Sequence, residues 1–108
     1  MIALAGNAKI FLYQMAIDMR KGFEGLSCAV ESSFEVELTS GAYFVFLNKQ
    51  KDRMKVLYWD SDGLAIWYKR LEKGSFPINE YGKISLERRE FLMLLEGVIP
   101  HRMQKRFK

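Results

Sequence analysis

Residues 43–71 read "YFVFLNKQKDRMKVLYWDSDGLAIWYKRL", and this stretch decides the fold. It holds three apolar runs, rich in aromatic and β-branched residues, at Tyr43–Leu47, Met54–Trp59 and Leu64–Leu71. Runs of this composition are typical of strands. The polar "NKQKDR" and the turn sequence "DSDG", in which glycine tolerates a positive φ, separate them. The stretch therefore predicts three consecutive antiparallel strands, a β-meander.

The second run is apolar on both sides. Successive residues of a strand face opposite ways, so Val56 and Tyr58 lie on one face while Leu57 and Trp59 lie on the other. A sheet with one solvated face alternates apolar and polar residues instead. We therefore expect part of the second face of the sheet to be covered as well.

The segment before the meander predicts a strand and a helix. Ile10–Tyr13 is a short apolar run, read as a first strand. From Met19 to Phe34 the apolar residues recur at helical spacing, and they are Phe23, Leu26, Val30 and Phe34. Asp18 is a natural N-cap for this helix, because its carboxylate can accept the backbone amides exposed at a helix start.

The segment after the meander predicts a short edge strand and a final helix. Lys83 and Ile84 suggest the edge strand, and Ser85 suits the N-cap of the helix. The apolar face of this helix consists of Phe91, Leu94, Leu95 and Val98. Gly97 and Pro100 end it. The order β-α-β-β-β-α predicts an α+β fold, an antiparallel β-meander with two packed helices.

Length and charge point to one domain with a basic tail. The chain has 108 residues, and no linker interrupts it, so we expect a single domain over residues 1–100 followed by a tail over 101–108. The net charge of +4 equals the charge of the tail, "HRMQKRFK", which contains no acid. Basic residues such as Arg102, Lys105 and Arg106 either bind nucleic acid or an acidic protein surface, or only aid solubility.

The composition also suggests a compartment. The single cysteine, Cys28, forms no internal disulfide and fits a reducing, cytoplasmic environment. The N-terminal stretch has neither the charged start of a signal peptide nor an apolar run long enough for a membrane helix. We therefore expect no membrane contact, and the sequence suggests no cofactor and no small-molecule substrate.

The second hairpin carries aromatic and cationic residues together. Trp59 and Trp67 offer flat faces for base stacking, while Lys55, Lys69 and Arg70 can neutralise phosphates. The competing interpretation is that the rings are simply core, since large rings in strands are usually buried. The two tryptophans share a face only if the strand register pairs them across the turn.

The stretch "DMRKGFEGL", residues 18–26, joins a cationic pair to a helix entry. Arg20 and Lys21 beside free amides would suit an anion-binding helix N-terminus. The plainer interpretation is capping by Asp18 with solvated cations. The stretch is not a phosphate-binding loop, because the Gly-Lys-Ser/Thr order of that motif is absent.

Catalytic interpretations have little support. Asp18, Asp60 and Asp62, completed by Glu72 or Glu96, would be needed for a metal-dependent nuclease, but the two turn aspartates suit local hydrogen bonding. His101 lies far in sequence from Cys28, which argues against a catalytic dyad. The sequence therefore predicts a protein that is not an enzyme.

Three blocks resemble a known family: "DMRKGFEGL", "FVFLNKQKDRMKVLYWDSDGLAIWYKRLEKGSF" and "SLERREFLMLLEG". They are similar to the signature blocks of the TnpB family, small accessory proteins of insertion sequences of the 66 type. This family is unrelated to the RNA-guided nucleases of the same name. The resemblance places family-signature residues at Asp18, Arg20, Lys21, Gly22, Trp59, Asp60, Gly63, Lys69, Arg70 and Glu72.

The resemblance implies a part in DNA transposition beside a larger transposase that cuts and joins the strands. Our first hypothesis is a non-catalytic accessory protein that binds DNA, the transposase of the same element, or both. The alternative is a pure protein–protein adaptor without DNA contact, and a metal-dependent nuclease subunit ranks below it. The first hypothesis expects Arg20, Lys21, Lys69 and Arg70 to meet in one positively charged patch.

Overall fold

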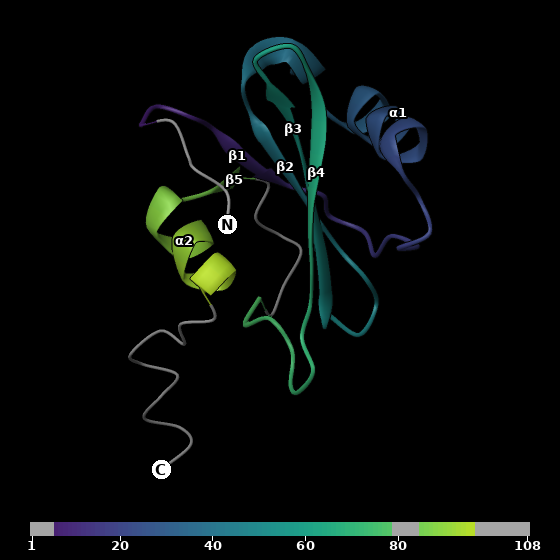
Figure 1. The fold of residues 1–108 in the computed structure, drawn as a ribbon, viewed down its shortest axis with the longest axis vertical. Coiled ribbons are helices and arrows are strands. Elements are labelled where there is room, and N and C mark those ends of the chain that lie inside the picture. The colour runs from purple at the N-terminus through teal and green to yellow at the C-terminus, as the bar shows by residue number, and fades with distance from the viewer. Residues whose placement is uncertain (1–5, 79–84, 97–108) are drawn as a thin grey trace.

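The computed structural model describes residues 6–78 and 85–96. Its elements follow the order β1 (Ile10–Leu12), α1 (Phe23–Ser33), the short 3₁₀ helix η1 (Leu38–Ser40), β2 (Tyr43–Leu47), β3 (Arg53–Asp60), β4 (Gly63–Arg70), β5 (Ser85–Leu86) and α2 (Arg88–Glu96). Figure 1 shows these elements as a ribbon. The α+β fold class is confirmed.

The five strands form one sheet in the order β4-β3-β2-β1-β5. β2, β3 and β4 pair antiparallel, which confirms the meander. β1 pairs parallel to β2, and α1 lies in the crossover between them. Parallel neighbours cannot be joined by a hairpin, so the chain needs this longer connection.

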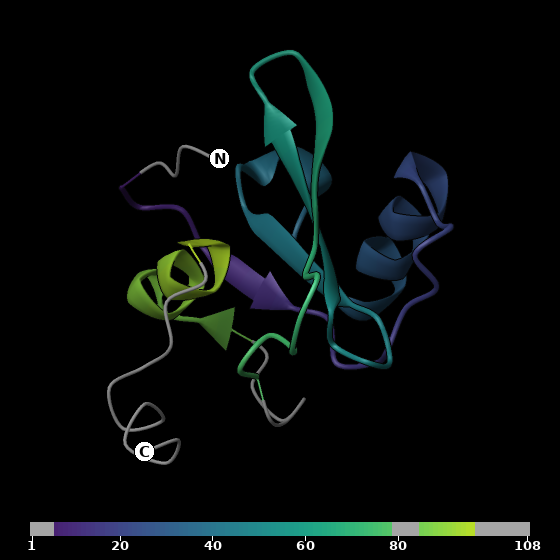
Figure 2. The same ribbon diagram turned by 60° about the horizontal axis from the view of Figure 1, so that its bottom comes forward.

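The two helices cover opposite faces of the sheet (Figure 2). Leu26 and Val30 of α1 pack with Phe44 and Leu57 of the strands, and we call this side the α1 face. The other side, the α2 face, buries a separate cluster of apolar side chains: Ile10, Leu12, Tyr43, Val45, Leu47, Met54, Val56, Phe76, Leu86, Phe91, Leu94 and Leu95. Coverage of both faces explains why every residue of β2 is buried. The expectation of a covered second face is confirmed.

Several local predictions were wrong. α1 begins at Phe23 with Gly22 at the N-cap position and no side-chain cap, so Asp18 does not cap it. Phe23, assigned to the apolar face of the helix, is 50% exposed.

The start of α2 also differs from the prediction. Ser85 belongs to β5, and α2 starts three residues later at Arg88. There the Glu90 carboxylate accepts the backbone N–H of Glu87 at 3.2 Å, as the acid of a capping box does.

Some predictions fall on residues outside the described part of the chain. These are the edge strand around Lys83 and Ile84, the helix stop at Gly97 and Pro100, and the tail over 101–108 with Arg102, Lys105, Arg106 and His101. The division into one domain and a tail stays a prediction.

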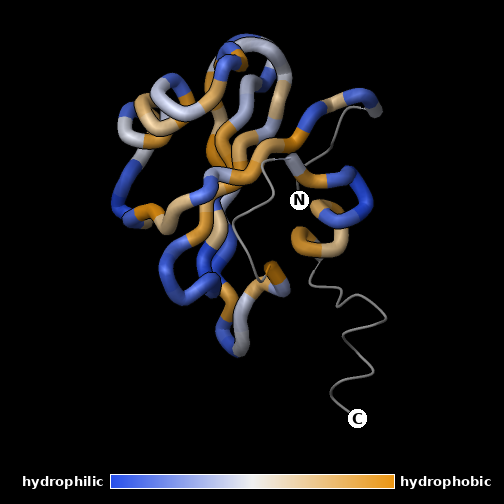
Figure 3. The backbone as a smooth tube through the Cα atoms, turned by 180° about the vertical axis from the view of Figure 1, so that it is seen from behind, coloured by the Kyte–Doolittle hydropathy of each residue, from blue (hydrophilic) through white to orange (hydrophobic). Residues whose placement is uncertain are grey.

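Hydrophobic segments run through the sheet, whereas the connections at its ends are hydrophilic (Figure 3). The β2–β3 turn lies at one end of the sheet, together with the connection that leads from β1 to α1. The β3–β4 turn and η1 lie at the other end, because Gly41 leads from η1 into the start of β2 and Tyr43 pairs with Tyr58 near the end of β3. The charged residues of the segment 6–78 are distributed between these two ends.

Candidate functional site

A buried lysine fixes the connection between β1 and α1. Lys55 of β3 is 9% exposed, and its Nζ donates to the backbone oxygens of Met19 at 2.7 Å and Lys21 at 2.8 Å. The ammonium also lies 4.9 Å from the centroid of the Tyr68 ring, within cation–π range. Lys55 therefore holds the backbone on both sides of Arg20. The sequence suggested Lys55 as a phosphate contact, but in the structure its ammonium binds the protein's own carbonyl groups.

Asp18 and Arg20 form a closed local pair. The Asp18 carboxylate accepts the backbone N–H of Arg20 at 2.9 Å and its guanidinium at 2.7–3.1 Å. These bonds lower the pKa of Asp18 from 3.8 to about 2, with the side-chain bond from Arg20 as the largest cause. The Arg20 side chain is still 91% exposed. The pair thus fixes the direction of a cation that faces solvent, and an exposed pair of this kind adds little stability.

The β2–β3 turn is organised by one amide side chain. Asn48 Oδ1 accepts the backbone N–H groups of Asp52 at 3.1 Å and Arg53 at 3.0 Å, while its Nδ2 donates to Asp52 Oδ1 at 2.6 Å. Lys51 adopts a positive φ of 58° in this turn, and its Nζ donates to the backbone oxygen of Ile78 at 2.8 Å. The turn therefore has a defined shape that presents Lys49 to solvent.

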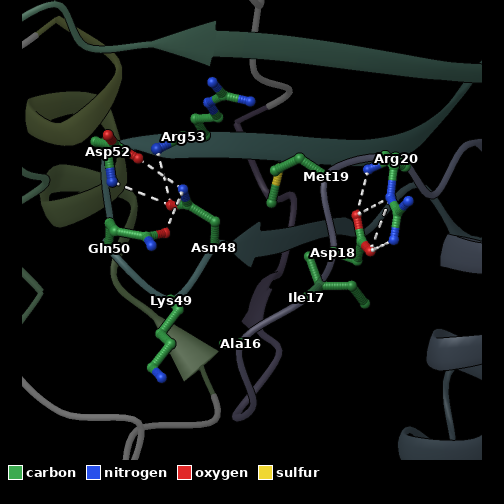
Figure 4. A pocket seen from close by; sticks show the side chains of 10 residues that line it. All are labelled: Ala16, Ile17, Asp18, Met19, Arg20, Asn48, Lys49, Gln50, Asp52 and Arg53. Carbon is green, nitrogen blue, oxygen red and sulfur yellow. Dashed lines mark hydrogen bonds and ion pairs between the residues drawn. The ribbon is translucent and has the colours of Figure 1, made fainter.

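The two segments border a shared depression with a volume of about 810 Å³. Residues 16–20 form one wall and residues 48–50, 52 and 53 the other (Figure 4). Three cations line it, namely Arg20, Lys49 and Arg53. Its two carboxylates are already bonded, Asp18 to Arg20 and Asp52 to Asn48. The depression therefore offers cations on opposite walls with few free acceptors.

The strand register separates the four cations that the sequence grouped. Arg70 pairs with Arg53 across β3 and β4, so it shares the α1 face and lies beside this end of the depression. Its Nε donates to Glu72 at 3.0 Å, and its side chain remains 60% exposed. Lys69 faces the opposite way, and its Nζ donates to the backbone oxygen of Leu95 in α2 at 3.1 Å. The prediction that Arg20, Lys21, Lys69 and Arg70 form one patch was wrong, because Lys69 lies on the α2 face.

The same register separates the tryptophans. Trp59 pairs with Leu64 and Trp67 pairs with Val56, which puts the two indoles on opposite faces. Trp67 packs against the core of the α2 face. The two rings therefore do not form one stacking platform.

Across residues 6–78, charge divides between the ends of the sheet. The end with the β2–β3 turn, which we call the basic end, holds nine cations against four acids, a net charge of +5. The cations are Arg20, Lys21, Lys49, Lys51, Arg53, Lys55, Lys69, Arg70 and Lys73, and the acids are Asp18, Glu24, Asp52 and Glu72. The end with η1 and the β3–β4 turn, the acidic end, holds five acids against Lys9, a net charge of −4. Its acids are Glu31, Glu35, Glu37, Asp60 and Asp62.

Comparison with known proteins identifies the family. The sequence profile of the family described as "IS66 Orf2 like protein" matches residues 8–105, nearly the whole chain. The chain belongs to this family. Membership makes it an accessory protein associated with an insertion sequence and confirms the resemblance seen in the three blocks.

Two relatives in the IS66 Orf2-like family come from Sinorhizobium fredii (strain NBRC 101917 / NGR234). The uncharacterized protein y4jC is 32% identical over 101 residues, which cover 91% of this chain and 86% of that protein. The uncharacterized protein y4hO is 29% identical over 100 residues, which cover 91% and 87%. No solved structure matches the chain.

The structure brings two of the three IS66 Orf2-like signature groups together. Asp18–Gly22 and the group formed by Lys69, Arg70 and Glu72 both lie at the basic end. Just after the first group, a Cβ on Gly25 would lie 3.0 Å from Lys21 Cβ, so this glycine leaves room for the Lys21 side chain. The remaining signature group, Trp59–Gly63, forms the β3–β4 turn at the acidic end.

The described residues of the IS66 Orf2-like chain contain no cluster of acids that could bind a metal ion. Among residues 6–78 and 85–96, no three His, Cys, Asp or Glu residues lie close enough to hold an ion. Asp18 lies at the basic end, whereas Asp60 and Asp62 lie at the other end of β3, and Glu72 pairs with Arg70. Within the same described ranges, no helix is long and apolar enough to cross a bilayer.

Sequence reasoning missed Asn48 and Arg53. The position of Arg53 could have been predicted, because a two-residue turn at Ser61 and Asp62 pairs Arg53 with Arg70 across the two strands. The role of Asn48 depends on bonds to residues four and five positions later, for which the polar run gives no specific pattern.

Proposed function

We propose that this insertion-sequence accessory protein binds DNA through its basic end, with backbone phosphates as the ligand. The observation that carries the proposal is that cations from separate segments of the chain meet on one end of the sheet. Arg20 and Lys21 come from the β1–α1 connection, Lys49 from the β2–β3 turn, Arg53 from the start of β3 and Arg70 from the end of β4. Phosphate contacts of this kind position a protein on DNA without reading its sequence.

The local geometry supports phosphate binding better than loose surface cations would. The Arg20 guanidinium is fixed by Asp18 and its backbone by Lys55, so less side-chain freedom is lost on binding. Arginine also presents a planar fork of donors that matches phosphate geometry. The basic end supplies three arginines in the part of the chain described: Arg20, Arg53 and Arg70.

The second candidate is an adaptor that meets the transposase of the same element without touching DNA. The charge balance of the described residues favours this alternative, because twelve cations oppose twelve acids there. A part of the chain with no net charge has weak long-range attraction for a polyanion. Its paired basic and acidic ends instead suit a protein partner with complementary charge.

A salt titration of DNA binding separates the two candidates. The affinity for a short duplex is measured by fluorescence anisotropy, and the slope of log K against log salt counts released counterions, roughly −0.9 per neutralised phosphate. The wild type is expected to show a steep slope. In a variant with Arg20→Ala, Lys21→Ala, Arg53→Ala and Arg70→Ala, the slope is expected to become shallower by roughly 0.9 for each of the four side chains, or roughly 3.6 in total.

The matched control changes the acidic end. Glu31→Gln, Glu35→Gln and Glu37→Gln alter three charges at the far end of the sheet. An eight-residue strand separates the ends by roughly 24 Å, which exceeds the screening length of about 8 Å at physiological salt. The control is therefore expected to keep the wild-type slope. If the two variants have equal slopes, the basic end is not the DNA site.

The tail needs its own variant because it carries four cations. Changing Arg102, Lys105, Arg106 and Lys108 to Ala is expected to reduce the slope while a salt-dependent part remains. A tail variant without any DNA binding would assign the DNA contact to the tail and contradict the proposal. A wild type without DNA binding that co-purifies with the transposase would establish the adaptor.

A further inference from the structure

β4 is an open edge of the sheet. It is the first strand in the order β4-β3-β2-β1-β5, and its eight residues pair with β3 in one continuous register from Arg53–Arg70 to Asp60–Gly63. No other described segment makes a backbone hydrogen bond to Gly63–Arg70. Exposed edges of this length are templates for a further strand, since their outer N–H and C=O groups lack partners in a sheet.

Two of the usual devices that blunt an edge, a proline and a bulge, are missing from β4. The strand has no proline, and the unbroken register leaves no room for a bulge. Its lysine, Lys69, points to the α2 face, and its Nζ donates to the backbone oxygen of Leu95, so the ammonium is bonded within the molecule. Proteins commonly protect edge strands with such features. The edge is therefore regular and accessible to a partner strand.

The charges along β4 are self-complementary. Asp60 and Asp62 lie at the turn where the strand starts, and Arg70 lies where it ends. The middle of the strand is apolar, with Ile66 half-buried and Tyr68 48% exposed. When two copies of the strand run antiparallel, the acidic start of each meets the basic end of the other.

We infer that β4 pairs antiparallel with β4 of a second copy of this chain, about a two-fold axis that passes through Ile66. Facing residues in a sheet must point to the same side, so the residue on the axis pairs with its own symmetry mate. This register sets Leu64 opposite Tyr68 and Asp62 opposite Arg70. Each dimer then contains two Asp62–Arg70 pairs and one sheet that continues through both copies.

A second copy suits this edge better than an unrelated strand, because antiparallel pairing brings the basic end of each copy beside the acidic end of the other. The two ends carry net charges of +5 and −4 among residues 6–78. Complementary charge of this kind fixes register and orientation. The Arg70 side chain is 60% exposed, so it can reach across the edge while Glu72 stays beside it. The dimer does not depend on DNA binding by the basic end, and in the dimer Arg70 binds Asp62 of the second copy, so the phosphate contacts are left to the other cations of that end.

Charge exchange tests the register directly. The mass of the purified protein is measured by analytical ultracentrifugation over a wide range of concentration, without DNA. The wild type is expected to dimerise. Arg70→Asp places two acids at each contact, and Asp62→Arg places two arginines there. Each single variant is therefore expected to dimerise at least about tenfold more weakly, since facing like charges oppose association.

The mixture of the two single variants is the decisive sample. A copy with Arg70→Asp and a copy with Asp62→Arg restore opposite charges at both contacts, so the mixture is expected to form a heterodimer with nearly wild-type affinity. Arg89→Asp, an exposed site on α2 away from β4, is the matched control and is expected to dimerise like the wild type. Circular dichroism of each variant establishes that it is folded.

Three results would overturn the inference. A wild type that stays monomeric at every concentration leaves the edge to another partner, such as a strand of the transposase. Single variants that dimerise like the wild type place the interface elsewhere. A mixture that stays monomeric while the wild type dimerises contradicts the Asp62–Arg70 register.

Discussion

The two ends of the sheet are built by the same strands, yet they differ in charge and in how their connections are held. At the basic end, Lys55 binds the β1–α1 connection and Asn48 shapes the β2–β3 turn. At the acidic end, a two-residue turn and η1 link the strands, and no described side chain of comparable burial spans them. The connections at the basic end are thus held by side-chain hydrogen bonds to the backbone, one set of them from a buried lysine.

This difference indicates a candidate site even though the net charge of the described residues is zero. Buried polar groups are costly unless they are fully hydrogen-bonded, so a buried ammonium that binds two carbonyls marks a segment whose position is fixed. In this protein the fixed segment contains Arg20 and Lys21 of the first signature block. The overall net charge would not have revealed it.

The largest expected effect comes from removing the lysine that supports the basic end. Lys55→Met keeps most of the side-chain volume but leaves the carbonyls of Met19 and Lys21 without their donor. We expect a loss of about 2 kcal/mol in the free energy of unfolding, because bonds to a charged group are worth roughly 1.5–3 kcal/mol and bound water replaces part of them. Chemical denaturation measures this loss.

Lys69→Met is the matched control. Lys69 is the neighbouring lysine on the other face, and it donates to one carbonyl, that of Leu95, at 3.1 Å. We expect it to cost less than half as much as Lys55→Met. Equal losses, or a smaller loss for Lys55→Met, would show that the β1–α1 connection does not depend on Lys55.

A smaller effect concerns the pair that orients Arg20. The pKa of Asp18 is lowered from 3.8 to about 2, chiefly by the side-chain bond from Arg20. The stability contributed by the ionised carboxylate is therefore complete above pH 3.8 and is lost as the pH falls toward 2. Side-chain carboxyl titration by NMR is expected to give the lowered pKa in the wild type and a higher pKa in Arg20→Ala, which stays below 3.8 because the backbone N–H of residue 20 still donates to the carboxylate.

Lys21→Ala serves as the control for this titration, because Lys21 is the smallest of the causes that lower the pKa of Asp18. The Asp18 pKa is expected to stay close to its wild-type value in this variant. An unchanged Asp18 pKa in Arg20→Ala would mean that the pair does not form in solution and that Arg20 is free to move.

The meander was predictable because alternation and turn residues are local signals. Each strand of the stretch 43–71 is bounded by polar or glycine-containing turns, and the structure keeps these boundaries within one residue. The position of β1 was not predictable in this way. A three-residue strand carries no information about its neighbour, and its parallel pairing with β2 depends on how α1 packs on the sheet.

The site was only partly predictable. Arg20, Lys21 and Arg70 were found from sequence blocks, but their separation from Lys69 follows from register, which alternates faces at every residue. Asp18 was assigned to a helix cap because capping is its commonest local role. Here the guanidinium two residues later competes for the carboxylate, and the helix starts without a side-chain cap.

The most direct test of the central claim is a map of backbone amide chemical shifts on adding a short DNA duplex. We predict that the shifts concentrate on residues 18–21, 48–53 and 69–72, the segments that meet at the basic end. Shifts concentrated on residues 31–40 and 60–63, or on the tail alone, would contradict DNA binding at the basic end.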